Sequence, residues 1–327
     1  MSADSATELA WRPLERADVP AWHRLLVAIE AVEQEDENPT EADVLTRFDD
    51  PYVDMARGSL AVWDGGRMVG YHYMKARTVA EASHDFWQFG GVDPQYRGRG
   101  VGGRLLTWAE DAARALSDER FPGVPVVMND GCGVGSTASE RLFAQLGYEP
   151  SRWYRNMVVA DLAATVPALP ESPAPDGVEF RVFTQERSAD ALAVRNEAFV
   201  DHYDSVPQTP EGWAHFTGGP AFRAGNSFVA YDAGRGTPLA IVLAEEYVTP
   251  EGRELYVALV GTVRAGRKRG IASALLAHTM RVGLADGYTR SCLGVDAESP
   301  TGAVGLYERL GYRAKQTWVA QRKPLDA

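Results

Sequence analysis

The sequence predicts an α/β (α+β) fold in two copies, each a sheet with helices packed against it. Three observations predict this: a length of 327 residues, an internal repeat, and a proline-rich segment near the middle of the chain. A single domain takes roughly 100–200 residues, so the length alone favours two domains. The repeat then indicates that the two domains share one architecture.

The repeat consists of three segments that recur in the same order, each displaced by about half the chain. The matching pairs are 10–12 with 179–181, 100–106 with 270–276, and 141–148 with 305–312. The copies have diverged, which is typical of a duplicated domain and not of a solenoid of short units. We therefore expect each half to run in the order strand, helices, several strands, helix, strand, helix and strands.

The two copies are separated by residues 163–177, which contain four prolines. Proline lacks a backbone donor and clashes with the preceding helical turn, so this segment favours extended backbone over regular helix. The expected organisation is an N-terminal domain over 1–162, a linker over 163–177, and a C-terminal domain over 178–327.

Local patterns predict the individual elements. In the second half, β-branched and aromatic residues predict strands at 227–231, 238–245, 254–263 and 291–295. Apolar spacing predicts a helix at 271–280, and a short helix at 303–310 is expected to end at Gly311. In the first half, the residues at 64–66 are Asp-Gly-Gly, which predicts a hairpin turn between two strands.

Composition and charge narrow the class of protein. The net charge is −12, from 45 acidic and 33 basic residues, which disfavours nucleic acid or an anionic membrane as the main partner. Two cysteines cannot build a disulfide framework or a four-thiolate site, and no cluster at ligand spacing predicts a metal. No signal peptide or run of ~18 apolar residues is visible, so we expect a cytoplasmic protein, as a monomer or homodimer.

A glycine-rich turn in the first half is a candidate phosphate site. It follows a strand that ends at Val92 and precedes a helix that begins near residue 101. Free N–H groups and the positive dipole at a helix N-terminus attract an anion, and arginines in the turn strengthen that attraction. The residues predicted to bind the ligand are Val92, Gln95, Arg97, Gly98, Arg99, Gly100 and Gly102.

The second half has a corresponding turn with one difference. Aligning the Leu-Leu pairs of the two helices places Gly270 against Gly100 and Lys268 against Gly98. Lysine is acceptable there if its φ stays negative, and the turn is one residue shorter counted from the preceding valine. Three adjacent cations favour phosphate, whereas the alternative is a solvated basic turn. The residues predicted to bind here are Val263, Arg267, Lys268, Arg269, Gly270 and Ala272.

Both turns resemble the Gln/Arg-x-x-Gly-x-Gly/Ala signature of the GNAT superfamily of acyl-CoA-dependent N-acetyltransferases. Gln95, Gly98 and Gly100 fit it completely, and the second turn fits with the lysine departure. A second family pattern, Ala-x-x-Leu-Tyr-x-x-x-Gly-Phe/Tyr, matches residues 303–312. The resemblance covers nearly the whole chain twice, and the tandem arrangement resembles the mycothiol synthase family. It implies GNAT-like domains, each with a central mixed, mostly antiparallel sheet with splayed fourth and fifth strands, and acetyl-CoA as cosubstrate.

The resemblance also implies roles in the acyl transfer. Tyr307 is expected to protonate the leaving thiolate, whereas its counterpart in the first half, Phe143, has no proton to give. Backbone N–H groups near 260–263 are expected to stabilise the oxyanion. Glu254 is expected to accept the proton of the amine.

Other residues compete for these roles or surround the acceptor. Glu245 and Glu246 are rivals of Glu254 as the base, and a glutamate at a strand end is often simply solvated. His202 and Asp204 are expected to lie at the acceptor site, although His202 could equally be a surface histidine.

The predicted function is acetyl-CoA-dependent transfer of an acetyl group to the primary amine of a small molecule, by direct attack in a ternary complex. The C-terminal domain is the expected catalyst, and the N-terminal domain is expected to be degenerate. One alternative is catalysis in the N-terminal domain, whose glycine turn is the more complete. The other is a non-catalytic protein that binds or senses acyl-CoA.

Overall fold

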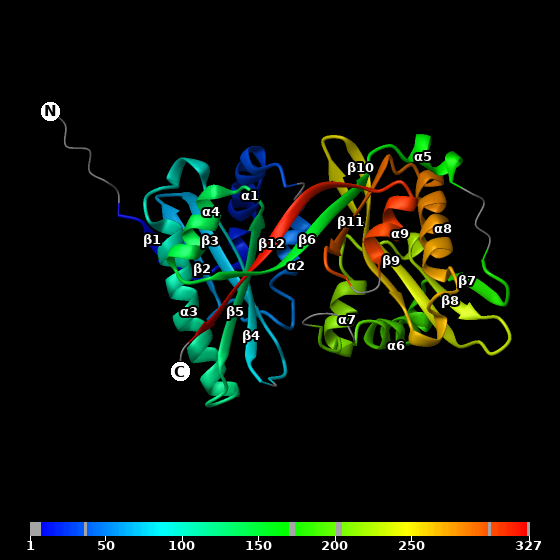
Figure 1. The fold of residues 1–327 in the computed structure, drawn as a ribbon. Coiled ribbons are helices and arrows are strands. Elements are labelled where there is room, and N and C mark those ends of the chain that lie inside the picture. The colour runs from blue at the N-terminus through cyan, green and yellow to red at the C-terminus, as the bar shows by residue number, and fades with distance from the viewer. Residues whose placement is uncertain are drawn as a thin grey trace. The chain divides into compact units, whose positions relative to one another are not determined.

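The computed structural model describes residues 8–35, 38–80, 82–169, 174–200, 205–299 and 302–325. It divides into two compact units (Figure 1). The first unit comprises Met1–Arg152 together with Trp318–Ala327, and the second comprises Trp153–Thr317. Each unit contains one central sheet with helices against it, so the expected α/β fold in two copies is confirmed.

The first unit is built from the following elements, in chain order: β1 (Ala10–Arg12), α1 (Val19–Glu33), α2 (Glu41–Thr46), β2 (Ser59–Asp64), β3 (Arg67–Ala76), β4 (His84–Val92), α3 (Val101–Arg120), β5 (Val126–Gly133), α4 (Thr137–Gln145), the start of β6 (Glu149–Val159) and the second part of β12 (Arg313–Leu325). The predicted hairpin is present, because Asp64 pairs with Arg67 and Gly65 has a φ of 56°. The strand order is β1-β2-β3-β4-β5-β12.

The second unit is built from the rest of β6, α5 (Leu162–Ala168), β7 (Val178–Val182), α6 (Ser188–Ala198), α7 (Pro210–Thr217), β8 (Phe228–Asp232), β9 (Pro238–Thr249), β10 (Gly252–Thr262), α8 (Ile271–Ala285), β11 (Arg290–Asp296) and α9 (Ala303–Arg309). Its strand order is β6-β11-β10-β9-β8-β7. Gly311 has a φ of 93°, as expected for the residue that terminates α9.

One parallel pair interrupts each otherwise antiparallel ladder. In the first unit β4 pairs with β5 in parallel, and that pairing ends at Trp87 and Asn129. In the second unit β10 pairs with β11 in parallel, and that pairing ends at Tyr256 and Cys292. Beyond these points the two strands have no further paired residues among those described, so they splay as the fold class predicted.

The final strand of each unit comes from the other half of the sequence. Residues Trp318 to Leu325 of β12, red in Figure 1, pair with β5, whereas Tyr154 to Val159 of β6 pair with β11. The units therefore differ from the expected domains 1–162 and 178–327 at both edges. Alternation along a strand predicts which face is buried, but it does not identify the neighbouring strand, which is why the boundary was misplaced.

The expected linker contains a helix, so the prediction of extended backbone is wrong over its first part. Helix α5 begins after Asp161, whose carboxylate accepts a hydrogen bond of 3.0 Å from the N–H of Ala164. Leu162 and Val166 are buried in the core of the second unit. Pro167 lies in the last turn of α5, so the backbone hydrogen bond that it cannot donate is lost only at the end of the helix. The N-cap and the two buried side chains offset the proline.

The hydrophobic core lies on both faces of each sheet. In the first unit, Trp22 of α1 is fully buried against one face, and Leu106 of α3 packs with Phe86 of β4 on the other. In the second unit, Leu255 of β10 is fully buried. It lies on the face covered by α8, since it packs so closely against Gly283 of α8 that a methyl group there would collide with it. Side chains alternate along a strand, so Glu254 and Tyr256 lie on the opposite face.

Candidate active site

The two glycine turns have the same backbone conformation. A short 3-10 turn, Pro94–Tyr96 or Arg264–Gly266, precedes an arginine in extended conformation, and each helix then begins after a left-handed glycine. That glycine is Gly100, with a φ of 81°, before α3, and Gly270, with a φ of 75°, before α8. In each unit, the turn and the start of the following long helix therefore bring several free N–H groups together at one point.

This equivalence corrects the alignment of the second turn. Arg97 donates from Nε to the carbonyl of Val92 (3.1 Å), and Arg267 donates likewise to the carbonyl of Thr262 (3.3 Å). Val92 thus corresponds to Thr262, the last residue of β10, and the two turns are equal in length. The expectation of a shorter turn is wrong because Val263 was aligned with Val92, although Val263 already lies beyond the strand.

The two arginines fasten the turns to the rest of their units. Arg97 pairs with Glu33 at the end of α1 (2.6 Å), and Arg267 donates to the carbonyl of Ala198 at the end of α6 (3.2 Å). Arg99 donates to the carbonyl of Gln95, and its guanidinium lies 4.7 Å from the ring centroid of Tyr96. These contacts hold the shape of each turn, and they are present without a bound anion.

The small residues one turn into the helices have a packing role. A methyl group on Gly102 would approach the side chain of Leu142 in α4 to 3.1 Å, so glycine permits α3 and α4 to lie close together. Ala272 occupies the same position in α8.

Lys268 departs from the condition set by the sequence. Its φ is +62°, close to the +72° of Gly98, so lysine occupies the left-handed region instead of negative φ. A residue with a β-carbon pays roughly 1–2 kcal/mol for this conformation. No hydrogen bond or ion pair holds the Lys268 ammonium within the described ranges. The cation is therefore available to an anion, at a cost in stability.

Replacing Lys268 with glycine should raise the free energy of unfolding by about 1 kcal/mol, because the strain is relieved. It should also weaken binding of acetyl-CoA, the ligand that the sequence leads us to expect at this turn, about tenfold, because a cation is lost. Urea unfolding and calorimetric titration measure the two effects, with Lys268→Arg as the control that retains both charge and strain. A variant with unchanged stability and unchanged affinity contradicts this account.

The second unit has an irregularity that the first lacks at the equivalent place. The register of β10 with β9 shifts between Val257 and Leu259, so Ala258 is an extra residue. The register of β4 with β3 runs without a shift from Phe86 to Val92. A bulge redirects backbone N–H groups and bends the strand. In this unit it lies just past the end of the β10–β11 pairing.

Tyr307 of α9 is buried, and burial raises its pKa to about 12. Its ring lies 6.0 Å from that of Tyr312 in an edge-on contact. Phe143 of α4 makes the same contact with Tyr148 at 5.4 Å, and both aromatic residues accept the same pattern of backbone hydrogen bonds. The two positions are thus equivalent, and they differ by one hydroxyl group.

Glu254 is a buried carboxylate on the face of β10 opposite α8. Its Oε2 lies 2.8 Å from Nε of Arg290, and both side chains are at most 5% exposed. Arg290 also pairs with the exposed Glu251 at 2.9 Å. Glu254 is therefore a charge held in position by Arg290.

The rival carboxylates differ in their surroundings. Hydrogen bonds from Arg253, Tyr288 and Arg223 lower the pKa of Glu246 to about 2, so it is a poor proton acceptor. Glu245 pairs across the ladder with Tyr256 and accepts a hydrogen bond of 3.0 Å from Tyr247, so it lies on the same face as Glu254. Of the predicted acceptor residues, His202 and Asp204 lie outside the described residues.

Sequence reasoning missed polar residues that β6 brings to this face. Asn156 pairs with Gly294 of β11, and Tyr154 pairs with Asp296. A methyl group on Gly294 would lie 3.6 Å from the hydroxyl of Tyr256 and 3.9 Å from Oδ1 of Asn156. These groups therefore converge beside the splayed strands. Only the pairing of β6 with β11 reveals this, because Asn156 belongs to the first half of the sequence.

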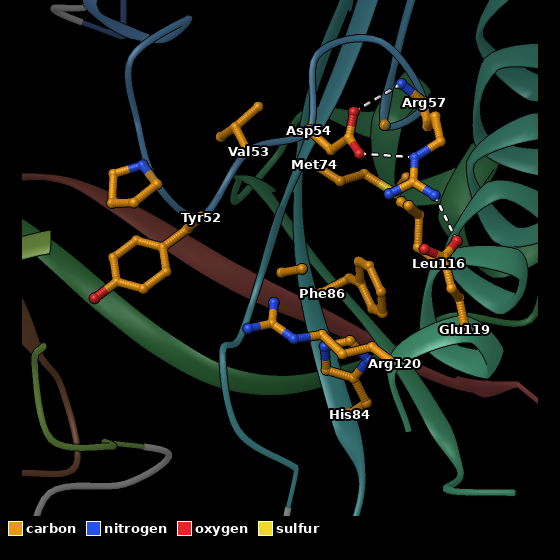
Figure 2. A pocket seen from close by; sticks show the side chains of 13 residues that line it. Tyr52, Val53, Asp54, Arg57, Met74, His84, Phe86, Leu116, Glu119 and Arg120 are labelled. Carbon is orange, nitrogen blue, oxygen red and sulfur yellow. Dashed lines mark hydrogen bonds and ion pairs between the residues drawn. The ribbon is translucent and has the colours of Figure 1, made fainter. Parts of the chain in front are cut away.

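A cavity in the first unit lies away from these features. Figure 2 shows it near the start of β4, with a volume of about 290 Å³ and with His84 and Phe86 in its wall. Arg57 lies at its edge, bonded to Asp54 and Glu119. The glycine turn lies at the other end of β4, so this cavity contains none of the predicted site residues.

No helix in the described part of the chain is long and apolar enough to cross a membrane. No group of three or more histidine, cysteine, aspartate or glutamate side chains in the described ranges could hold a metal ion.

Comparison with known proteins identifies the architecture. Residues 19–148 and 192–312 each match the acetyltransferase (GNAT) family, and together they make up most of the chain. The chain belongs to the GNAT acetyltransferase family. It is thus a tandem GNAT protein and an acyltransferase, and acetyl-CoA is the cosubstrate that this family uses.

Curated relatives match the chain over most of their length. The chain is 29% identical to a mycothiol acetyltransferase of Thermobispora bispora over 262 residues, which is 77% of this chain and 79% of that protein. It is 30% identical to the mycothiol acetyltransferase of Rhodococcus erythropolis, covering 76% and 79% of the two chains.

Solved GNAT structures resemble the whole chain. A GCN5-related N-acetyltransferase from Sphaerobacter thermophilus has a TM-score of 0.75 at 26% identity, covering 97% of this GNAT protein and 95% of that chain. A tandem GNAT protein from the clavulanic acid pathway has the same TM-score at 15% identity, covering 98% and 99%, and shows the shared fold.

Proposed function

We propose that the second unit transfers an acetyl group from acetyl-CoA to the primary amine of a small molecule, by direct attack in a ternary complex. The observation that carries this assignment is the hydroxyl of Tyr307. The Tyr307 ring makes the same edge-on contact in the second unit as the Phe143 ring makes in the first, and only Tyr307 has a hydroxyl. The bulge at Ala258 and the buried Glu254 lie in the same unit. The first unit is the proposed degenerate copy.

The turn before α8 is the proposed pyrophosphate site. Gly270 and the first residues of α8 present N–H groups, and Lys268 and Arg269 add positive charge. The described part of the chain contains no hydrogen bond or ion pair to the Arg269 guanidinium. These residues fit the diphosphate of acetyl-CoA, whereas Arg267 shapes the turn.

The splayed part of β10 is the proposed oxyanion site. Past Tyr256 the N–H groups on the β11 side of β10 have no partner strand among the described pairs, and the bulge at Ala258 turns them. Such donors stabilise the negative charge that develops on the carbonyl oxygen during attack. They lie on the strand that leads into the phosphate turn.

Tyr307 is the proposed proton donor to the sulfur. A phenol of pKa about 12 is uphill from an alkyl thiol of pKa ~8.5 by about 5 kcal/mol for complete transfer. The hydroxyl therefore acts first as a hydrogen-bond donor to the sulfur while the C–S bond breaks. Glu254 remains the proposed proton acceptor, because it is a buried carboxylate on the face opposite α8 and lies two residues before the β10–β11 pairing ends at Tyr256.

The proposed acceptor is a small polar amine. Glu245, Tyr256, Asn156 and Asp296 line the face beside the splay with carboxylate, hydroxyl and amide groups, which suit an ammonium group with neighbouring hydroxyls. Relatives carry the name mycothiol acetyltransferase, so an amine of the mycothiol type is the first to test.

Valine at Gly270 should lower kcat/KM for amine acetylation about 100-fold, because a β-branched residue does not adopt its φ of +75° and the turn loses its shape. Valine at the matched Gly100 should leave activity within about threefold. Thiol release with acetyl-CoA and a panel of small amines measures both, after thermal melts show that the variants are folded. The reverse pattern assigns catalysis to the first unit. If no amine in the panel causes thiol release, the protein is a binding module.

A further inference from the structure

We propose that the gap between β4 and β5 in the first unit is a binding site that prefers free coenzyme A, the product of the reaction, to acetyl-CoA. Asp130 and Gln321 set this preference at the point where the gap opens. The proposal rests on the acetyl-CoA chemistry of the proposed function, and it adds that the first glycine turn, the phosphate site predicted from the sequence, holds the diphosphate of a coenzyme A molecule.

The register of the two units identifies Asp130. It is the first residue of β5 after the pairing with β4 ends at Asn129, just as Leu293 is the first residue of β11 after Cys292. Its neighbour on the next strand is Gln321 of β12, whereas the neighbour of Leu293 is Met157 of β6. A fully apolar pair in the second unit is thus a carboxyl and an amide in the first.

Polar residues also occupy buried positions on β3 and β4 of the first unit. Gln88 of β4 is buried. Its Oε1 lies 3.1 Å from Nε2 of His72, and its Nε2 donates a hydrogen bond of 2.8 Å to the hydroxyl of Tyr148. Counted back from the two turns and past the bulge, Gln88 corresponds to Val257 and His72 to Val242, both buried hydrophobic residues. Buried polar groups are costly unless they are hydrogen-bonded, and in the first unit these groups bond to one another where the second unit has apolar side chains.

Asp130 is only partly satisfied by the protein. Its Oδ1 accepts a hydrogen bond of 2.7 Å from the N–H of Gly131, and burial raises its pKa to about 8. The nearby charged groups are acidic: Glu140 of α4 and Glu35 after α1 act on Cys132, the next residue on the same face. Asp130 is half-buried, and the described residues provide no hydrogen bond to its Oδ2.

The chemistry of the two ligands differs at the sulfur. A free thiol can donate its hydrogen to the Asp130 carboxylate or accept one from the carboxylic acid. An acetyl thioester has no S–H, and its methyl group would be buried against Asp130 and Gln321 without a partner. In the second unit the corresponding residues are Leu293 and Met157, which are apolar. The preference for free thiol is therefore expected in the first unit alone.

Calorimetric titration of the Gly270→Val variant tests the proposal, because only the first turn then retains its shape. Free coenzyme A should bind at least tenfold more tightly than acetyl-CoA. Asp130→Leu, which copies the second unit, should abolish or reverse this ratio, and Asp130→Asn, which retains a polar group of similar size, should retain most of it. Equal affinities, tighter acetyl-CoA binding, no binding of either ligand, or a ratio unchanged in Asp130→Leu would each overturn the proposal.

A second measurement covers the case in which Gly270→Val does not fold. Wild-type protein titrated with each ligand should show two sites with opposite preferences, and Asp130→Leu should change only one of them. A single shared preference counts against the proposal. The proposed function is tested by amine acetylation, so the loss of activity in Tyr307→Phe and the ligand ratio at Asp130 succeed or fail separately.

Discussion

Replacing Tyr307 with phenylalanine should lower kcat for amine acetylation about 100-fold, with little change in the affinity for acetyl-CoA. The substitution removes one hydroxyl and leaves the edge-on contact with Tyr312 intact, so the fold is retained. What is lost is the donor to the leaving sulfur. Steady-state thiol release over a range of pH measures the effect, and a thioester of a more acidic thiol should recover much of the lost rate.

Tyr312→Phe is the matched control, because its hydroxyl is bonded to Ser291 at 2.7 Å and not to the gap. It should alter stability more than kcat. Since burial holds the pKa of Tyr307 at about 12, the wild-type rate should not fall with an apparent pKa near 10. Unchanged turnover in Tyr307→Phe would remove the second unit as the site of catalysis.

Replacing Arg290 with methionine should lower the free energy of unfolding by about 3–5 kcal/mol, because it leaves Glu254 as an uncompensated buried charge. The two side chains are 5% and 3% exposed, so water cannot replace the lost partner. Urea unfolding of the full chain measures the loss.

The double variant Glu254→Gln/Arg290→Met should recover much of that loss, because neither charge remains. If the double and single variants are equally unstable, the ion pair does not contribute as described. The double variant also isolates the chemistry: if Glu254 accepts a proton, kcat stays low even where stability has returned.

Local patterns predicted most elements of the fold. The hairpin at 64–66 is present, the strand at 291–295 and the helix at 271–280 lie within observed elements, and the strand predicted at 227–231 begins one residue later, at Phe228, because turn residues and apolar spacing determine these elements locally. The partners of β6 and β12 were not predictable, because the residues along a strand do not identify the neighbouring strand. Helix α5 was missed because burial of Leu162 and Val166 outweighs a proline that comes only in its last turn.

The candidate site likewise contains features that local motifs predict and features that depend on strand pairing. The turns and Tyr307 follow from motifs at fixed spacing. The ion pair of Glu254 with Arg290, the bulge at Ala258 and the convergence of Asn156 on Gly294 depend on which strands are neighbours. The left-handed lysine was not foreseen because a strained residue contradicts the local preference that sequence reasoning applies.

The exchange of β6 and β12 has a consequence for how the protein is made. The backbone passes between the units at residues 152–153 and again at 317–318, so a break within 163–177 would leave each fragment contributing a strand to the other's sheet. On the ribosome, β5 has no neighbour on its outer side until β12 has been synthesised. The first unit therefore matures after the second has been almost completely translated, and its open edge needs protection from other nascent chains during that interval.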